Sequence, residues 1–106
     1  MRILFDQGVP VPRRRHLADH SVETAAELRW ATLSDRQRLD RAEADGFDLL
    51  ITTDGNLKHQ QVLTGRRLAI LVLSTTSWPR IRRRATDVAQ AVDALSAGDY
   101  QDLQIQ

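Results

Sequence analysis

Two aspartates, each placed directly after a short apolar run, are the residues of this sequence best suited to chemistry. Asp6 follows Ile3-Leu4-Phe5, and Asp54 follows FDLLITT at 47–53. Apolar runs of this length are typical of buried strands. If these strands are neighbours about 4.8 Å apart, the carboxylates repel each other unless a proton, an arginine or a divalent cation compensates. An open carboxylate pair that also meets a substrate phosphate is how proteins commonly bind Mg²⁺.

Other polar residues could join this pair. Asp35 begins a predicted helix, Asn56 lies two residues after Asp54, and Ser74 and Thr75 follow a third apolar run. An aspartate after a strand is also a common turn residue, and one in a first helical turn complements the helix dipole. The presence of such aspartates at two strand ends, where ligand sites of this class concentrate, favours a functional role.

The apolar runs predict the sheet that would position these residues. The strongest strands are expected at 3–5, 47–53 and 68–73, with weaker ones at 21–24 and 100–105. Strands that are apolar throughout and separated by helices indicate a parallel sheet covered on both faces. The sequence therefore predicts a single α/β domain, a three-layer sandwich with a central, mainly parallel sheet. The polar residues described above would meet at the carboxyl edge of that sheet.

Two helices are predicted with clear signals. Ser34 and Gln37 have the spacing of a capping box and predict a helix over 35–45. The longest helix is expected over 79–98, because apolar residues recur there at steps of four and three. These residues are Ile81, Ala85, Val88, Val92 and Leu95.

The charges indicate a local anionic partner rather than a wholly basic surface. The formal net charge is only +1, which excludes a protein that binds nucleic acid over its whole surface. Lys58 is the lone lysine, and the other 14 basic residues are arginines, nine of which cluster at 13–15, 66–67 and 80–84. Because guanidinium groups form forked contacts with phosphate, these clusters suit a phosphate-bearing partner.

Several other classes of site are excluded or disfavoured. The chain has no cysteine, which excludes disulfides and thiolate metal sites, and its three histidines lack the spacing of zinc ligands. No apolar run is long enough to span a membrane, and the N-terminus lacks the layout of a signal peptide. We therefore expect a cytoplasmic protein with no membrane partner.

Three segments together resemble a known family: RILFDQGVP, SDRQRLDRAEADGFDLLITTDGNL and RLAILVLSTTSWPRI. They resemble the PIN-like proteins of the DUF5615 group, which are compact relatives of the PIN-domain nucleases. The resemblance covers nearly the whole chain. Its core is an Asp after the first strand, an acid that opens the middle helix, and a T-x-D-x-[DN] element at 52–56.

The resemblance implies a fold, a chemistry and a setting. PIN domains are α/β sandwiches, and active members are Mg²⁺- or Mn²⁺-dependent ribonucleases. Many are toxins of bacterial toxin–antitoxin pairs, so it also implies an RNA substrate, a cognate antitoxin protein and a homodimer. The family's acidic cluster matches Asp6, Asp35 and Asp54, with Glu43 as the alternative middle acid. Asn56 stands where many PIN-like chains have Asp, which should weaken metal binding.

A mechanism follows from the resemblance. Asp6, Asp54 and Asn56 would hold the ion, and Asp35 or Glu43 would hold it or orient the attacking water. The metal would lower the pKa of bound water and stabilise charge on the scissile phosphate. Two hydroxyls and three arginines would contact phosphate and the RNA backbone: Ser74, Thr75, Arg13, Arg82 and Arg83.

Two rival interpretations remain at this stage. Because Asn56 replaces one acid of the cluster, a PIN-like domain of this kind could bind RNA or a protein without cutting RNA. A phosphoacceptor receiver domain is also a small α/β fold whose acceptor Asp ends a central strand, as Asp54 does. Receivers need a second acid after the first strand, where this chain has Gln7, and a late lysine, whereas Lys58 follows Asp54 closely. A match in fold without those site residues carries little weight.

Overall fold

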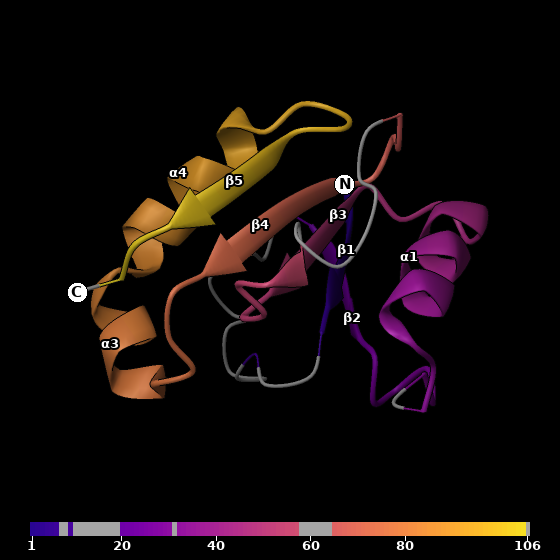
Figure 1. Ribbon diagram of the computed structural model, residues 1–106. Helices are drawn as coiled ribbons and strands as arrows, with labels where there is room; N and C mark the ends of the chain where they lie inside the picture. Colours follow the sequence, from indigo (N-terminus) through magenta and orange to yellow (C-terminus); the bar gives the residue numbers. More distant parts are fainter. Residues whose placement is uncertain (7–8, 10–19, 31, 58–64, 106) are drawn as a thin grey trace.

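A computed structural model describes the chain except for residues 7–8, 10–19, 31, 58–64 and 106 (Figure 1). Five strands and three helices follow one another along the described chain. They are β1 (Arg2–Phe5), β2 (Ser21–Thr24), α1 (Asp35–Ala44), β3 (Leu49–Thr52), β4 (Ala69–Leu73), α3 (Trp78–Arg83), α4 (Ala85–Ala94) and β5 (Tyr100–Leu103). The strands form one all-parallel sheet, which confirms the predicted fold class.

The strand order β2-β1-β3-β4-β5 creates a switch point in the middle of the sheet. From β1 the chain continues to β2 on one side of it, whereas β3, β4 and β5 all lie on the other side. In open parallel sheets, ligands bind outside the carboxyl ends of the strands at such a point. Here that point lies between β1 and β3, where Phe5 pairs with Ile51. Asp6 directly follows β1, and Thr52 is the last residue of β3.

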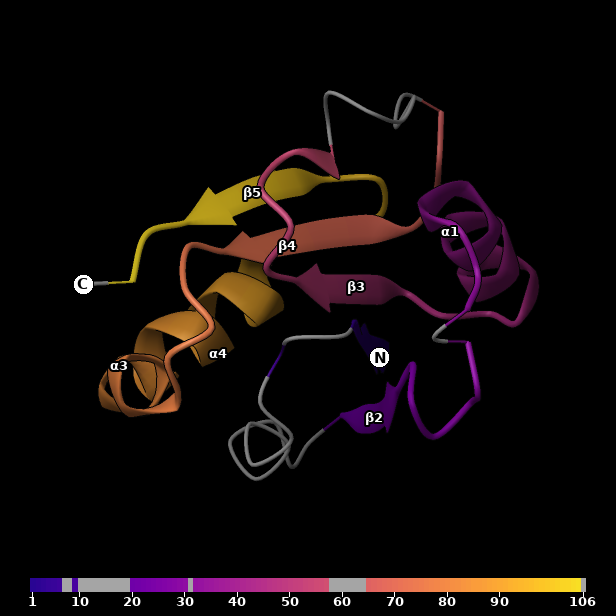
Figure 2. The same cartoon turned by 60° about the horizontal axis from the view of Figure 1, so that its bottom comes forward.

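Helices cover both faces of the sheet, as the two views show (Figures 1 and 2). Side chains alternate between the faces along each strand. Ile3 and Phe5 pack in the core beneath α3 and α4, whereas Leu4 and Leu50 pack in the core beneath α1. By the same alternation, Asp6 and Thr52 belong to the α1 face.

Helix α1 confirms the prediction from the capping box. The Gln37 backbone N–H donates to Ser34 Oγ at 3.2 Å, and the Ser34 N–H donates to Gln37 Oε1 at 2.9 Å. These two bonds satisfy donors that the first helical turn would otherwise leave unpaired. They fix where α1 begins, and therefore where Asp35 and Arg38 lie.

The long helix expected over 79–98 is wrong in two respects, because it is two helices and because the second, α4, ends at Ala94. The chain leaves helical geometry at Arg84, with φ −110° and ψ 23°, which separates α3 from α4. The apolar stripe continues across the break, since Ile81 and Val88 are both buried in one core. The periodicity of apolar residues shows which side of a helix is buried. It does not reveal a bend when the helices before and after the bend pack against the same core.

The remaining elements differ from the predictions mainly at their ends. The strand expected at 47–53 spans Leu49–Thr52, and the strand expected at 68–73 spans Ala69–Leu73. The weaker strands are present as β2 and β5, the two edges of the sheet. In the part of the chain that the structure describes, no helix is long and apolar enough to cross a bilayer.

Candidate functional site

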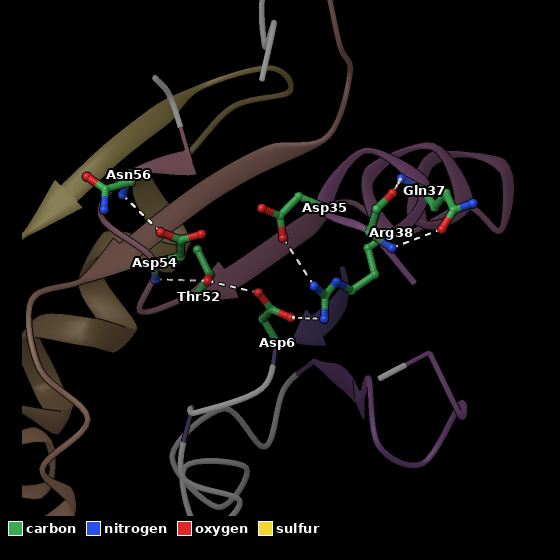
Figure 3. A network of polar contacts seen from close by, with 8 residues as sticks. Asp6, Asp35, Gln37, Arg38, Thr52, Asp54 and Asn56 are labelled. Carbon is green, nitrogen blue, oxygen red and sulfur yellow. Dashed lines mark hydrogen bonds and ion pairs between the residues drawn. The ribbon is translucent and has the colours of Figure 1, made fainter. Parts of the chain in front are cut away.

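The candidate site begins with a hydrogen bond between neighbouring strands at their carboxyl ends. The Thr52 hydroxyl donates to Asp6 Oδ2 at 3.0 Å (Figure 3). Thr52 is almost fully buried, with 1% of its surface exposed. A threonine suits this position because its β-branched side chain fits a buried strand while its hydroxyl supplies the donor. The bond orients one oxygen of Asp6.

Arg38 binds the other oxygen of Asp6 and joins it to Asp35. Its Nη1 lies 3.2 Å from Asp6 Oδ1, and its Nη2 lies 3.1 Å from Asp35 Oδ1. All three side chains are largely shielded from solvent, with exposures of 13% for Arg38, 14% for Asp6 and 27% for Asp35. Asp35 and Arg38 are three residues apart on α1, a spacing that places them on one helix face. The guanidinium thus lies between two carboxylates from different elements (Figure 3).

Asp54 is tied to the same threonine from the other side. Its backbone N–H donates to Thr52 Oγ1 at 3.1 Å, and its own Oδ1 accepts from the Asn56 N–H at 3.0 Å. The second contact is the local turn that aspartate favours after a strand. Thr52 therefore links Asp6 to the loop that carries Asp54 and Asn56.

The donor chemistry fits a hard divalent cation, but the present arrangement is satisfied by arginine. Carboxylate and amide oxygens are the ligands that Mg²⁺ prefers. Across the described residues, no group of three or more histidine, cysteine or acidic side chains is placed to hold a metal ion. Asp6 and Asp35 instead share the Arg38 guanidinium as their cation. Asp6 and Asp35 are therefore the pair from which a metal site could be built.

Glu43, the alternative middle acid, lies at the other end of α1. Its carboxylate pairs with Arg66 at 3.4 Å. It lines a cavity of about 410 Å³ together with Phe47 and Leu68, next to the amino ends of the strands. Eight residues of helix separate Glu43 from Asp35, which corresponds to about 12 Å. The structure therefore brings Asp35, and not Glu43, to Asp6.

The hydroxyl oxygens of Ser74 and Thr75 each accept a hydrogen bond from a backbone N–H. Ser74 Oγ accepts from the Ile105 N–H at 2.7 Å, and Thr75 Oγ1 accepts from the Ser77 N–H at 3.0 Å. These bonds fasten the chain after β5 and shape the turn before α3. Each of these bonds uses the hydroxyl oxygen as an acceptor and not the O–H that a phosphate oxygen would accept from, so the expected phosphate contact stays a prediction.

The predicted RNA-contacting arginines differ in what the structure shows of them. Arg82 and Arg83 are exposed on α3, and neither has a carboxylate partner within the described ranges. Helix α3 follows the carboxyl end of β4, so it lies toward the same edge of the sheet as Asp6 (Figure 1). Arg13 lies outside the described residues.

Tyr100, the first residue of β5, adds a titratable group to the sheet. It is half-buried on the α1 face, and its hydroxyl lies 3.5 Å from Asp102 Oδ1. Burial raises the pKa of Tyr100, and the negative charges of Asp102 and Asp54 raise it further. The charge of Asp54 therefore affects the pKa of Tyr100 on β5, the strand at the edge of the sheet.

Sequence reasoning missed the roles of two residues. Thr52 is the first residue of the T-x-D-x-[DN] element. Side chains two residues apart on a strand share one face, so pairing Leu4 with Leu50 would have placed Thr52 beside Asp6. Arg38 has no comparable signal, because it is one arginine among 14 and two other arginines lie on the same helix.

Comparison with known proteins does not bear on these assignments. No family model matches the chain, and no curated protein or solved structure matches it with significance. Conclusions about activity therefore depend on the residues and geometry described above.

Proposed function

We propose that this chain is a metal-dependent ribonuclease of the PIN-like type. One observation carries the proposal: Asp6 and Asp35, from different elements, converge at the switch point of a parallel sheet, with Asp54 linked to Asp6 through Thr52. Ligand sites of this fold class concentrate at that point. The resemblance of the acidic residues to those of PIN-like nucleases supplies the reaction class.

Each residue of the site has a role in this proposal. Asp6 and Asp35 would hold Mg²⁺ or Mn²⁺, and Asp54 and Asn56 would approach it from the loop after β3. The ion would lower the pKa of bound water and neutralise charge on the scissile phosphate. Thr52 keeps an oxygen of Asp6 in place through its 3.0 Å hydrogen bond. The amide oxygen of Asn56 carries no charge, so it would contribute less than a carboxylate.

RNA would lie along the carboxyl edge of the sheet. Arg82 and Arg83 are exposed on α3 near this edge and are suited to phosphate contacts. Such contacts add affinity that does not depend on sequence and that falls as salt rises. Single-stranded or looped RNA is the expected substrate, because its bases are accessible.

The test is cleavage of a mixed RNA pool with Mn²⁺, with Mg²⁺ and with EDTA. Asp6→Asn and Asp54→Asn should each reduce cleavage by at least about 100-fold, since ligands matter no less than their supporting residues. Asp87→Asn is the matched control, because Asp87 is exposed on α4 and pairs only at 3.7 Å with Arg84. Cleavage that persists in EDTA, or that survives in both site variants, would disprove the proposal.

A second candidate function is an RNA-binding module that does not cut. It is favoured by Arg38, which already pairs with both Asp6 and Asp35 without a metal. This alternative predicts RNA binding that is equal in EDTA and in Mn²⁺, with no cleavage of the pool.

The resemblance further proposes that this protein acts as the toxin of a toxin–antitoxin pair. Expression of the wild-type chain would then arrest growth, whereas expression of Asp54→Asn would not. Equal growth with both chains at equal protein levels would argue against a toxin.

A further inference from the structure

We infer that Arg38 is a resident counter-ion of the acidic pair, which a divalent cation must displace before it can bind. The inference rests on the proposed function, because it concerns access to the proposed metal site. It adds a positioning residue that controls occupancy of that site.

The geometry of Arg38 differs from that of an ordinary surface ion pair. Its two terminal nitrogens each take a different carboxylate, Asp6 Oδ1 at 3.2 Å and Asp35 Oδ1 at 3.1 Å. On the same helix, Arg36 reaches Asp40 only at 3.9 Å, with 78% and 58% of the two side chains exposed. Exposed ion pairs of that kind contribute little to the stability of the fold, whereas charge-assisted hydrogen bonds that are shielded from solvent are stronger.

The guanidinium and a divalent ion would compete for the same atoms. A cation bound to Asp6 Oδ1 and Asp35 Oδ1 would lie where Arg38 now binds, and two positive charges in one partly buried place repel strongly. The Thr52 hydroxyl binds the other oxygen of Asp6, so that carboxylate stays oriented when Arg38 leaves. The free energy needed to displace Arg38 therefore weakens the binding of metal, and at low cation concentration Arg38 keeps the site.

Calorimetric titration with Mn²⁺ alone tests this competition. Arg38→Met keeps an unbranched apolar side chain on α1 and removes the guanidinium, so Mn²⁺ should bind at least about tenfold tighter than to wild type. Arg36→Met is the matched control on the same helix and should leave the affinity unchanged. Adding Asp6→Asn to Arg38→Met should abolish the gain. An unchanged or weaker affinity in a folded Arg38→Met protein would overturn the inference.

Nuclear magnetic resonance of ¹⁵N-arginine in the wild-type protein gives a readout that does not depend on the folding of Arg38→Met. The Arg38 side-chain signal, assigned with Arg38→Lys, should move as Mg²⁺ is added and should stay fixed in Asp6→Asn. If Mg²⁺ binds through Asp6 while the Arg38 signal stays fixed, only the inference is wrong. If no cation binds through Asp6 in any variant, the proposed metal site is wrong as well.

Discussion

Replacing Thr52 with valine isolates the hydroxyl that links Asp6 to Asp54. Valine has nearly the shape of threonine, so the buried methyl packing survives while both hydrogen bonds are removed. The bond to the Asp6 carboxylate contributes about 1.5–3 kcal/mol, and the bond from the half-buried Asp54 N–H contributes about 0.5–1 kcal/mol. Because Arg38 still neutralises Asp6, the lower ends of these ranges apply. We expect a loss of about 2 kcal/mol in the free energy of unfolding.

Urea unfolding followed by circular dichroism measures this loss. With a denaturant slope of about 2 kcal/mol per molar, the midpoint should fall by about 1 M. Thr53→Val is the matched control, because it makes the same change at a half-buried neighbour whose hydroxyl has no hydrogen bond within the described residues. If Thr52→Val costs no more than Thr53→Val, the Thr52 hydroxyl does not hold the two aspartates in place.

The same substitution should also affect the proposed activity. Without the hydroxyl, Asp6 loses the hydrogen bond that orients its Oδ2, and the Asp54 N–H loses its bond to Thr52 on β3. RNA cleavage should therefore fall by about 10-fold or more in a protein that remains folded. Full activity in Thr52→Val would show that the link has no part in placing the acids.

Three other predictions concern the pH response, the turn before β5 and the salt response. Asp102→Asn should lower the pKa of Tyr100, the chain's single tyrosine, in an ultraviolet titration. Since folding raises that pKa, Tyr100 favours the fold below pH 10 and loses this contribution as pH rises further, a loss that Asp102→Asn should reduce. Gly98→Ala should destabilise the fold by about 2 kcal/mol, because φ is +81° and the new Cβ would meet a backbone carbonyl oxygen at 2.8 Å. Replacing Arg82 and Arg83 by alanine should reduce the salt slope of RNA binding by about 0.7 for each phosphate that these arginines neutralise.

Each of these predictions has a control in the same chain. Gly65→Ala places a side chain at φ +86° with no atom within 4 Å, so it carries the strain without the collision. A loss in Gly98→Ala no larger than in Gly65→Ala would contradict a collision with the carbonyl oxygen. Arg67→Ala removes an exposed charge at the opposite edge and should leave the salt slope unchanged. For Tyr100, a titration that Asp102→Asn does not move would contradict the assigned cause.

The sheet and its carboxyl edge could be predicted because they depend on patterns that the sequence carries directly. The apolar runs that precede Asp6 and Asp54 are long enough to mark buried strands, and apolar strands separated by helices indicate a parallel sheet, whereas the strand order was not predicted. The choice between Asp35 and Glu43 was also within reach. A helix that leads into a parallel strand begins near the carboxyl edge and ends near the amino edge, so only its first turn can face Asp6.

The position of Arg38 could not be predicted, because it depends on distances between side chains from separate elements. A guanidinium at the end of a long flexible side chain can reach several partners, and the sequence offers many acids. The bend at Arg84 was hidden for a different reason. Both halves of the stripe pack on one core, so the periodicity of Ile81 and Val88 is the same whether the helix bends or not.

The all-parallel order of the sheet has a consequence for how the protein folds. No two strands of the described sheet are joined by a hairpin, so every ladder closes a loop of at least roughly 15 residues before it gains a hydrogen bond. Such topologies fold slowly for their size. The contact between Thr52 and Asp6 spans 46 residues, so the site is assembled by one of the longer loop closures in the sheet. The link from Asp6 through Thr52 to Asp54 therefore needs β3, and a nascent chain lacks this part of the site until β3 has been made.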